Sequence, residues 1–169
     1  MKDITRYSIV LFSICLVSAG MLSLIYNIAE PRIVEQRKLQ EEKAIKEVLP
    51  QEPVEIEKIE EEDLVFYKAK DIKGNLIAYV FICEARGYAS DIRTVISLKP
   101  QGSIIAVKVL EQRETPGVGT RITEDEFLNQ FKNKNVNGQF DTITGATISS
   151  TAVINSIKEK AQKVLKQVF

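Results

Sequence analysis

Apolar residues fall into three arrangements along the chain: one long run, several short alternating runs and a helical stripe near the C-terminal end. The long run, Ile9–Ile28, carries no charge and spans about 20 residues, enough to cross the hydrocarbon core of a bilayer as a helix. A cleaved signal peptide is the alternative, but the run is longer than a usual signal-peptide core and lacks a clear small-x-small cleavage site. We therefore predict a retained membrane anchor over residues 1–30. Positive residues flank both of its ends, so they do not decide its orientation.

Half of residues 31–62 are charged, and the segment predicts a stalk followed by a connector. Glu30–Leu49 has a broken apolar stripe at helical spacing, with Pro31 suited to the first turn and Pro50 ending the helix. Gln51–Asp63 is rich in glutamate and predicts a solvated connector.

Residues 63–169 predict a folded domain. Four β-rich runs form two pairs, each pair around a turn that contains glycine, which favours two hairpins of an antiparallel sheet. The runs are Leu64–Lys70 with Leu76–Cys83, and Ile92–Leu98 with Ser103–Leu110.

Two helices are expected after the strands. A short one starts at Thr123 or Glu124 and ends at Phe131, and a long one covers Ala152–Phe169. The apolar positions of the long helix lie on one face and its lysines on or near the other, so this helix should pack on the sheet. The fold class is therefore α+β, with an antiparallel sheet and packed helices.

Composition narrows the chemistry. The 169 residues carry 23 basic and 23 acidic side chains, and this balance argues against a nucleic-acid partner. There is no histidine, and the two cysteines stand far apart, so no metal site is expected. Redox chemistry would need an organic cofactor.

The stretch Asp141–Thr151, DTITGATISST, is the first candidate for that chemistry. Hydroxyl residues cap helix starts, small residues let a ligand approach the backbone, and a helix N-terminus favours an anion such as phosphate. A helix cap without any ligand is the alternative. A second candidate is the Pro-Gly loop within Glu111–Thr120, which either lines a ligand site or only reverses the chain.

These two stretches resemble a known family. Asp141–Thr147 is similar to the acceptor pattern Asp-x-x-Ser/Thr-Gly-Ala-Thr of proteins that carry covalent FMN, and Glu114–Gly119 is similar to their second flavin-site sequence, Glu-Thr-Pro-Gly-Leu-Gly. With a single anchor in front, the chain resembles the G subunits of Rnf electron-transport complexes. Val118 in place of leucine is a minor departure, and Gln112 stands near a position that is often histidine.

The resemblance implies an electron-relay flavoprotein in a complex that couples electron transfer between ferredoxin and NAD to sodium or proton translocation. It implies FMN attached through its phosphate to Thr147 by a flavin transferase, other membrane and iron–sulfur subunits as partners, and no complete active site in this chain alone. It also implies a single-pass protein of a bacterial or archaeal cell membrane whose domain lies outside the cytoplasm. The expected cofactor-binding residues are Thr147, Thr144, Gly145, Ala146, Ser149, Glu114, Thr115, Gly117 and Tyr88.

Two alternatives stay open at this point. The C subunit of the sodium-translocating NADH–quinone reductase shares the acceptor motif, although this chain is short for it. A non-flavinylated accessory or assembly subunit would use the TGAT run only as a helix cap.

Overall fold

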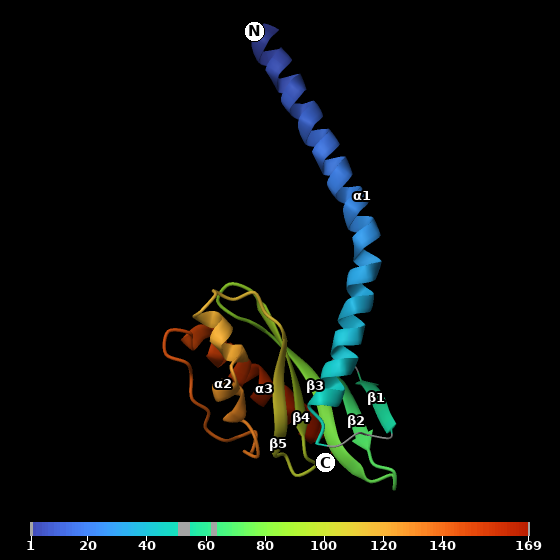
Figure 1. The fold of residues 1–169 in the computed structure, drawn as a ribbon, viewed down its shortest axis with the longest axis vertical. Coiled ribbons are helices and arrows are strands. Elements are labelled where there is room, and N and C mark those ends of the chain that lie inside the picture. The colour runs from blue at the N-terminus through green and yellow to red at the C-terminus, as the bar shows by residue number, and fades with distance from the viewer. Residues whose placement is uncertain (1, 51–54, 62–63, 169) are drawn as a thin grey trace. The chain divides into compact units, whose positions relative to one another are not determined.

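The computed structural model describes residues 2–50, 55–61 and 64–168 and begins with one long helix (Figure 1). Helix α1 covers Lys2–Glu47, and within it Ile4–Glu47 contains a segment long and apolar enough to cross a membrane. Large apolar side chains between Ile4 and Ile28 are exposed, as expected for a helix that faces lipid or another membrane helix. Pro31 lies inside α1, so its predicted place in a first helical turn is wrong. Proline has no backbone N–H, so one helical hydrogen bond is missing at Pro31, but the helix continues on both sides of it.

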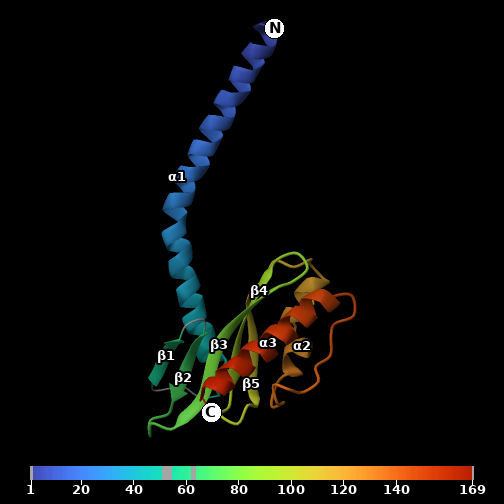
Figure 2. The same cartoon turned by 180° about the vertical axis from the view of Figure 1, so that it is seen from behind.

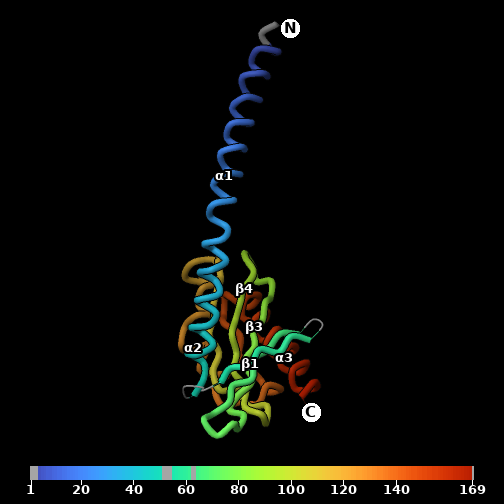
Figure 3. Tube along the Cα trace, turned by 90° about the vertical axis from the view of Figure 1, so that its right-hand side faces the viewer, coloured from blue at the N-terminus to red at the C-terminus, as the bar shows by residue number. Residues whose placement is uncertain are grey.

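The chain divides into two compact units, Met1–Gln40 and Glu41–Phe169. The second unit contains one five-stranded antiparallel sheet in which strand order follows sequence order, and the tube in Figure 3 passes from teal to yellow across it. The four predicted strands are confirmed within a few residues. The strands are β1 (Glu55–Glu61), β2 (Leu64–Lys70), β3 (Leu76–Arg86), β4 (Asp91–Leu98) and β5 (Ile104–Glu111).

Strand β1 corrects the prediction of a solvated connector. Glu55–Glu61 pairs with β2 along its whole length, although five of its seven residues are exposed. Charged side chains are common on edge strands, where they discourage pairing with other chains. Ile56 and Ile59 are three positions apart and therefore face opposite sides of the sheet, where each packs against a different core cluster.

Both faces of the sheet are covered. Helix α3 (Thr147–Val168) covers one face; it lies in front of the sheet in Figure 2 and behind it in Figure 1. On β3 and β4, Phe81 and Ile96 point into the core under α3, whereas their neighbours Val80 and Val95 point to the other face. There Ala44 and Ile45 at the end of α1, and Val48 just after it, cover them.

The remaining elements connect the sheet to α3. A 3-10 helix, η1 (Gly119–Thr123), follows β5, and α2 (Asp125–Asn129) comes next, so the predicted short helix is confirmed in part of its range. Helix α3 begins at Thr147 rather than at the predicted Ala152. Thr147–Ser150 form its first turn, so the acceptor motif, which ends at Thr147, ends on the first residue of the helix.

The predicted apolar stripe of α3 is confirmed, and four of its positions are fully buried. These are Val153, Ile157, Ala161 and Val164. Phe127 in α2 and Phe131 just after it are also buried and contact each other edge to face. The α+β fold is thus as expected, and this packing holds the start of α3 rigidly in place.

Candidate functional site

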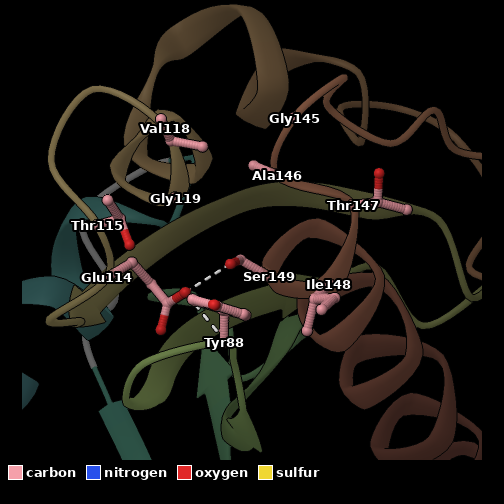
Figure 4. Close-up of a pocket in the computed structure, with 10 residues that line it drawn as sticks. All are labelled: Tyr88, Glu114, Thr115, Val118, Gly119, Gly145, Ala146, Thr147, Ile148 and Ser149. Atoms are coloured by element: carbon pink, nitrogen blue, oxygen red, sulfur yellow. Dashed lines mark hydrogen bonds between the residues drawn. The ribbon is translucent and has the colours of Figure 1, made fainter.

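Three segments that are distant in sequence enclose a pocket of about 330 Å³ (Figure 4). They are the turn between β3 and β4, the loop after β5, and the start of α3. This volume lies at the lower end of the usual range for small-molecule sites. The lining residues are Tyr88, Glu114, Thr115, Val118, Gly119, Gly145, Ala146, Thr147, Ile148 and Ser149.

Most of the residues proposed from the sequence meet in this pocket. Seven of the nine line it; Thr144 lines a neighbouring hollow of about 280 Å³, and Gly117 lies in the adjoining turn. Three lining residues were not among the expected cofactor contacts: Ile148, which directly follows the acceptor motif, and Val118 and Gly119, which end the second motif. Ile148, Val118 and Tyr88 are exposed and form apolar parts of the pocket's lining.

The acceptor motif folds into a tight turn that leads directly into α3. Ala146 donates its backbone N–H to the carbonyl of Ile143 at 2.9 Å, and Gly145 has a φ of 87°, which side chains other than glycine rarely adopt. The buried Ser150 hydroxyl fastens this turn. It donates to the carbonyl of Ala146 at 2.8 Å and accepts from the N–H of Ile143 at 3.2 Å.

The first turn of α3 offers donors to an anion. Within the part of the chain that the structure describes, the first backbone bond of this helix runs from Ser150 to Ala146 at 3.0 Å. The N–H groups of Thr147, Ile148 and Ser149 precede that bond and have no acceptor among the described residues. Thr147 is exposed and lines the pocket, and its side chain points away from Glu114 (Figure 4). Free N–H groups and the helix dipole together favour phosphate at this place.

Glu114 is the buried charge of the site, with 4% of its surface exposed. Its Oε1 accepts hydrogen bonds from the N–H of Ala89 at 3.1 Å and from both the N–H and the hydroxyl of Ser90, at 2.9 and 3.2 Å. Its Oε2 accepts from the N–H of Tyr88 at 3.1 Å and from the Ser149 hydroxyl at 2.5 Å. One carboxylate therefore joins all three segments of the pocket.

Opposing influences act on the pKa of Glu114. Burial raises the pKa, but the hydrogen bonds from Ser149, Ser90, Ala89 and Tyr88 outweigh burial and leave the pKa below its ordinary value of 4.5. Among the described residues no lysine or arginine forms an ion pair with this carboxylate. The charge is stabilised by dipoles alone and is not neutralised.

Two glycines make room for Glu114. A Cβ atom at Gly87 would lie 2.7 Å from Glu114 Oε1, and one at Gly119 would lie 2.7 Å from Glu114 Cβ. Neither position tolerates a larger residue without displacement of the glutamate. Gln112, which stands near a position that is often histidine in the resembling family, accepts the backbone N–H of Glu114 at 2.7 Å and so helps to hold it.

Other polar groups have clear structural roles. Gln130 pairs with the backbone of Asp141 through both atoms of its amide, at 2.7 and 3.1 Å, which fixes the start of the acceptor motif. Cys83 is buried, and burial raises the pKa of its thiol to about 12, so it is not a nucleophile. No group of three or more acidic or cysteine residues able to hold a metal ion occurs in the described ranges.

Comparison with known proteins agrees with this geometry. The FMN-binding domain family matches residues 87–162, and the RnfG N-terminal region matches residues 1–48. The G subunit of an ion-translocating oxidoreductase complex from Methanosarcina acetivorans is 31% identical to this chain, over 98% of this chain and 97% of the relative. The chain belongs to the RnfG family.

A second relative in this family has a name that states its reaction. The G subunit of the proton-translocating ferredoxin:NAD(+) oxidoreductase complex of Clostridium ljungdahlii is 30% identical, over 89% of this chain and 85% of the relative. Membership of the RnfG family, together with the apolar segment of α1, indicates a membrane protein. The match to the FMN-binding domain supports FMN as the cofactor.

The fold has solved counterparts. The crystal structure of Shewanella oneidensis NqrC superposes with a TM-score of 0.52 at 19% identity, over 73% of this chain and 74% of that one. The C subunit of the Na(+)-translocating NADH-quinone reductase from Parabacteroides distasonis gives 0.50 at 24% identity, over 60% and 61%. At these identities the likeness establishes the shared fold and nothing about function.

Proposed function

We propose that this chain is an electron-relay subunit of an Rnf-type complex that couples electron transfer between ferredoxin and NAD to ion translocation, with FMN esterified through its phosphate to Thr147. The position of Thr147 carries this proposal. It ends the acceptor motif, is the first residue of α3, is exposed, and lines the pocket. When bound, FMN would supply the one- and two-electron chemistry for which this chain has no side chains.

The residues around Thr147 fit a phosphate-bearing flavin. The N–H groups of the first turn of α3, which lack acceptors among the described residues, would hold the phosphate, and Gly145 presents an open backbone beside them. Tyr88, Thr115 and Ala146 would line the remainder of the cofactor site. The Ser149 hydroxyl, expected to contact the cofactor, donates to Glu114 in this structure, and Thr144 lines the neighbouring hollow, so the backbone N–H groups of α3 are the candidates for binding the phosphate.

The setting of the site is also part of the proposal. Residues 1–30 would anchor the chain in a bacterial or archaeal cell membrane, residues 31–40 would lead out of it, and the unit Glu41–Phe169, which includes β1, would form the flavin domain outside the cytoplasm. A flavin transferase would load the domain, and other membrane and iron–sulfur subunits would exchange electrons with it. The chain alone would have no complete active site.

A C subunit of a sodium-translocating NADH–quinone reductase is the second candidate, because its members share this fold. The match to the RnfG N-terminal region and the relatives of about 30% identity favour the Rnf assignment. Identification of the subunits that co-purify with the full chain from native membranes separates the two. Iron–sulfur subunits of a ferredoxin-linked complex are expected.

The covalent link is tested on the full chain co-produced with a flavin transferase. Denatured protein should fluoresce in a gel and carry the mass of one FMN less one water, located on the peptide that contains Thr147. Thr147→Ala should abolish the signal. Thr142→Ala is the matched control, since this threonine is exposed in the same motif but lies outside the pocket, and it should keep the flavin. An undiminished signal in Thr147→Ala would contradict the assignment, and an unmodified wild type would favour an accessory subunit.

A further inference from the structure

Glu114 has a different role from the one that its motif suggests. The pattern Glu-Thr-Pro-Gly adjoins the pocket, so a cofactor contact is the first expectation for its glutamate. Both carboxylate oxygens are instead occupied by the protein, Oε1 by Ala89 and Ser90 and Oε2 by Tyr88 and Ser149. A carboxylate with these partners has little capacity left for a ligand.

We propose that Glu114 is a positioning residue that holds the walls of the flavin pocket together and leaves one fixed negative charge beside it. The carboxylate orders the turn that carries Tyr88 and ties it, through Ser149, to the first turn of α3. In Figure 4 the carboxylate lies between Tyr88 and Ser149, while the Thr147 side chain points away from it. The glutamate thus aligns the acceptor without contacting the acceptor hydroxyl.

The close fit of two glycines supports this role independently. Gly87 precedes the turn that Glu114 binds, and Gly119 starts η1 on the other side of the carboxylate. A Cβ atom at either position would come within 2.7 Å of an atom of Glu114. At Gly119 the three nearest atoms all belong to Glu114, whereas at Gly87 the Ile92 side chain would lie equally close, so Gly119 is the position shaped around the glutamate.

The negative charge of Glu114 affects the electrostatics of the pocket. Glu114 accepts from N–H groups and hydroxyls, and no cation among the described residues offsets it, so the pocket keeps a net negative contribution from this residue. A fixed negative charge opposes the addition of electrons to a nearby group. Glu114 therefore lowers the reduction potential of a flavin held in the pocket. This part of the inference rests on the proposed function, whereas the positioning role does not.

The positioning role is tested by hydrogen–deuterium exchange on the full-length apo chain in detergent. Glu114→Gln should speed exchange of the Tyr88–Ser90 amides at neutral pH by at least about tenfold, as expected when charge-assisted bonds are lost. Amides in the centres of β4 and α3 should remain protected. Glu126→Gln, which removes an exposed carboxylate from α2, is the control and should change nothing at Tyr88–Ser90. Unchanged exchange in Glu114→Gln would overturn the positioning role.

The charge is tested by the midpoint potential of the flavin in loaded protein. Glu114→Gln should raise the potential, and Glu114→Asp, which keeps the charge but shortens the reach, should speed exchange while leaving the potential near that of wild type. Equal shifts in both variants, or no shift in either, would overturn the electrostatic part.

The proposal stays testable if Glu114→Gln does not fold or if wild type binds no flavin. Should Glu114→Gln fail to fold, Ser149→Ala removes the 2.5 Å bond between the walls without a change of charge and should also speed exchange at Tyr88–Ser90. Unchanged exchange there would count against the positioning role. Should wild type bind no flavin, the proposed function fails, while exchange on the apo chain still decides the role of Glu114.

Discussion

Carboxylates fasten two regions of the domain, and they do so with different partners. At the pocket, Glu114 is buried and accepts from backbone N–H groups and hydroxyls. On the opposite face of the sheet, Glu41 at the end of α1 pairs with Arg93 of β4 at 2.5 Å, and both side chains are about one quarter exposed. Glu47 pairs with Lys108 on β5 in the same region.

The two kinds of partner, cations at the end of α1 and N–H or hydroxyl groups around Glu114, serve different purposes. Ion pairs at the end of α1 neutralise both partners and supplement an apolar contact, the cluster of Ala44, Ile45, Val48, Val80 and Val95. Dipoles around Glu114 orient loops that have little apolar packing of their own, and they leave the charge in place. A neutralised pair supports docking, whereas a charge held by dipoles suits a site whose electrostatics matter. Added salt should therefore weaken the ion pairs at the end of α1 and hardly affect the hydrogen bonds to Glu114.

Loss of the buried carboxylate should have the largest effect on this comparison. Glu114→Ala leaves the buried N–H groups of the Tyr88 turn without their acceptor, and we expect a loss of about 3–4 kcal/mol of unfolding free energy. Urea unfolding of the full-length apo chain in detergent measures it. A loss of unfolding free energy below about 1 kcal/mol would show that Glu114 stabilises the domain no more than an exposed ion pair does.

The same carboxylate should make stability depend on pH. Its pKa is lowered in the folded chain, so its contribution is fully present above the ordinary value of 4.5 and is lost as the pH falls through the folded value. Wild type should therefore lose stability below about pH 4.5 more steeply than Glu114→Gln. Parallel profiles of unfolding free energy against pH for the two proteins would contradict this expectation.

Filling the space beside Glu114 should have an intermediate effect. Gly87→Ala places a methyl group 2.7 Å from Glu114 Oε1, and overpacking of this kind costs about 2 kcal/mol. Gly74→Ala is the comparison: a Cβ atom at this position meets no other atom within 4 Å, so its cost is only the backbone strain of a φ of 78°, about 1–2 kcal/mol. Urea midpoints of both variants give the comparison, and a smaller loss in Gly87→Ala would argue against the tight fit.

Removal of an ion pair at the end of α1 should have the smallest effect. Arg93→Met keeps most of the apolar stem and should cost about 1 kcal/mol or less, with the difference from wild type shrinking as salt is added. Arg86→Met is the matched control, because Arg86 forms an ion pair with Asp91 in which both side chains are largely exposed. It should unfold as wild type does at every salt concentration. A loss of unfolding free energy in Arg93→Met that does not change with salt would show that the Arg93–Glu41 ion pair does not stabilise the fold through charge attraction.

Prediction from sequence succeeded where periodicity was strong. The hairpins and the stripe of α3 follow from alternation and from helical spacing, and both are present. It failed for β1, because EIEKIEE has no alternation and its pairing with β2 is a tertiary feature. It also placed the start of α3 five residues late, because hydroxyl and β-branched residues favour caps over helix interiors in isolation.

The composition of the site was predicted better than its internal bonding. The two motifs singled out Thr147 and Glu114, Tyr88 was proposed as a contact outside them, and the structure places all three around one pocket. Which of them contacts a ligand and which supports another residue depends on hydrogen bonds across 24 to 35 positions of sequence. No local pattern encodes such bonds, so Glu114 was grouped with the cofactor contacts and its link to Ser149 was not foreseen.

The exposure of Thr147 bears on the order of maturation. The Thr147 hydroxyl, the acceptor in the proposed function, lies on the surface of a helix whose later turns are packed into the core, so its geometry exists only once the domain has folded. On the proposed function, the flavin transferase would therefore work on the finished fold and would have no need to capture a nascent chain. Loading with cofactor would then act as a checkpoint, because a misfolded copy would not present the helix start that the transferase needs.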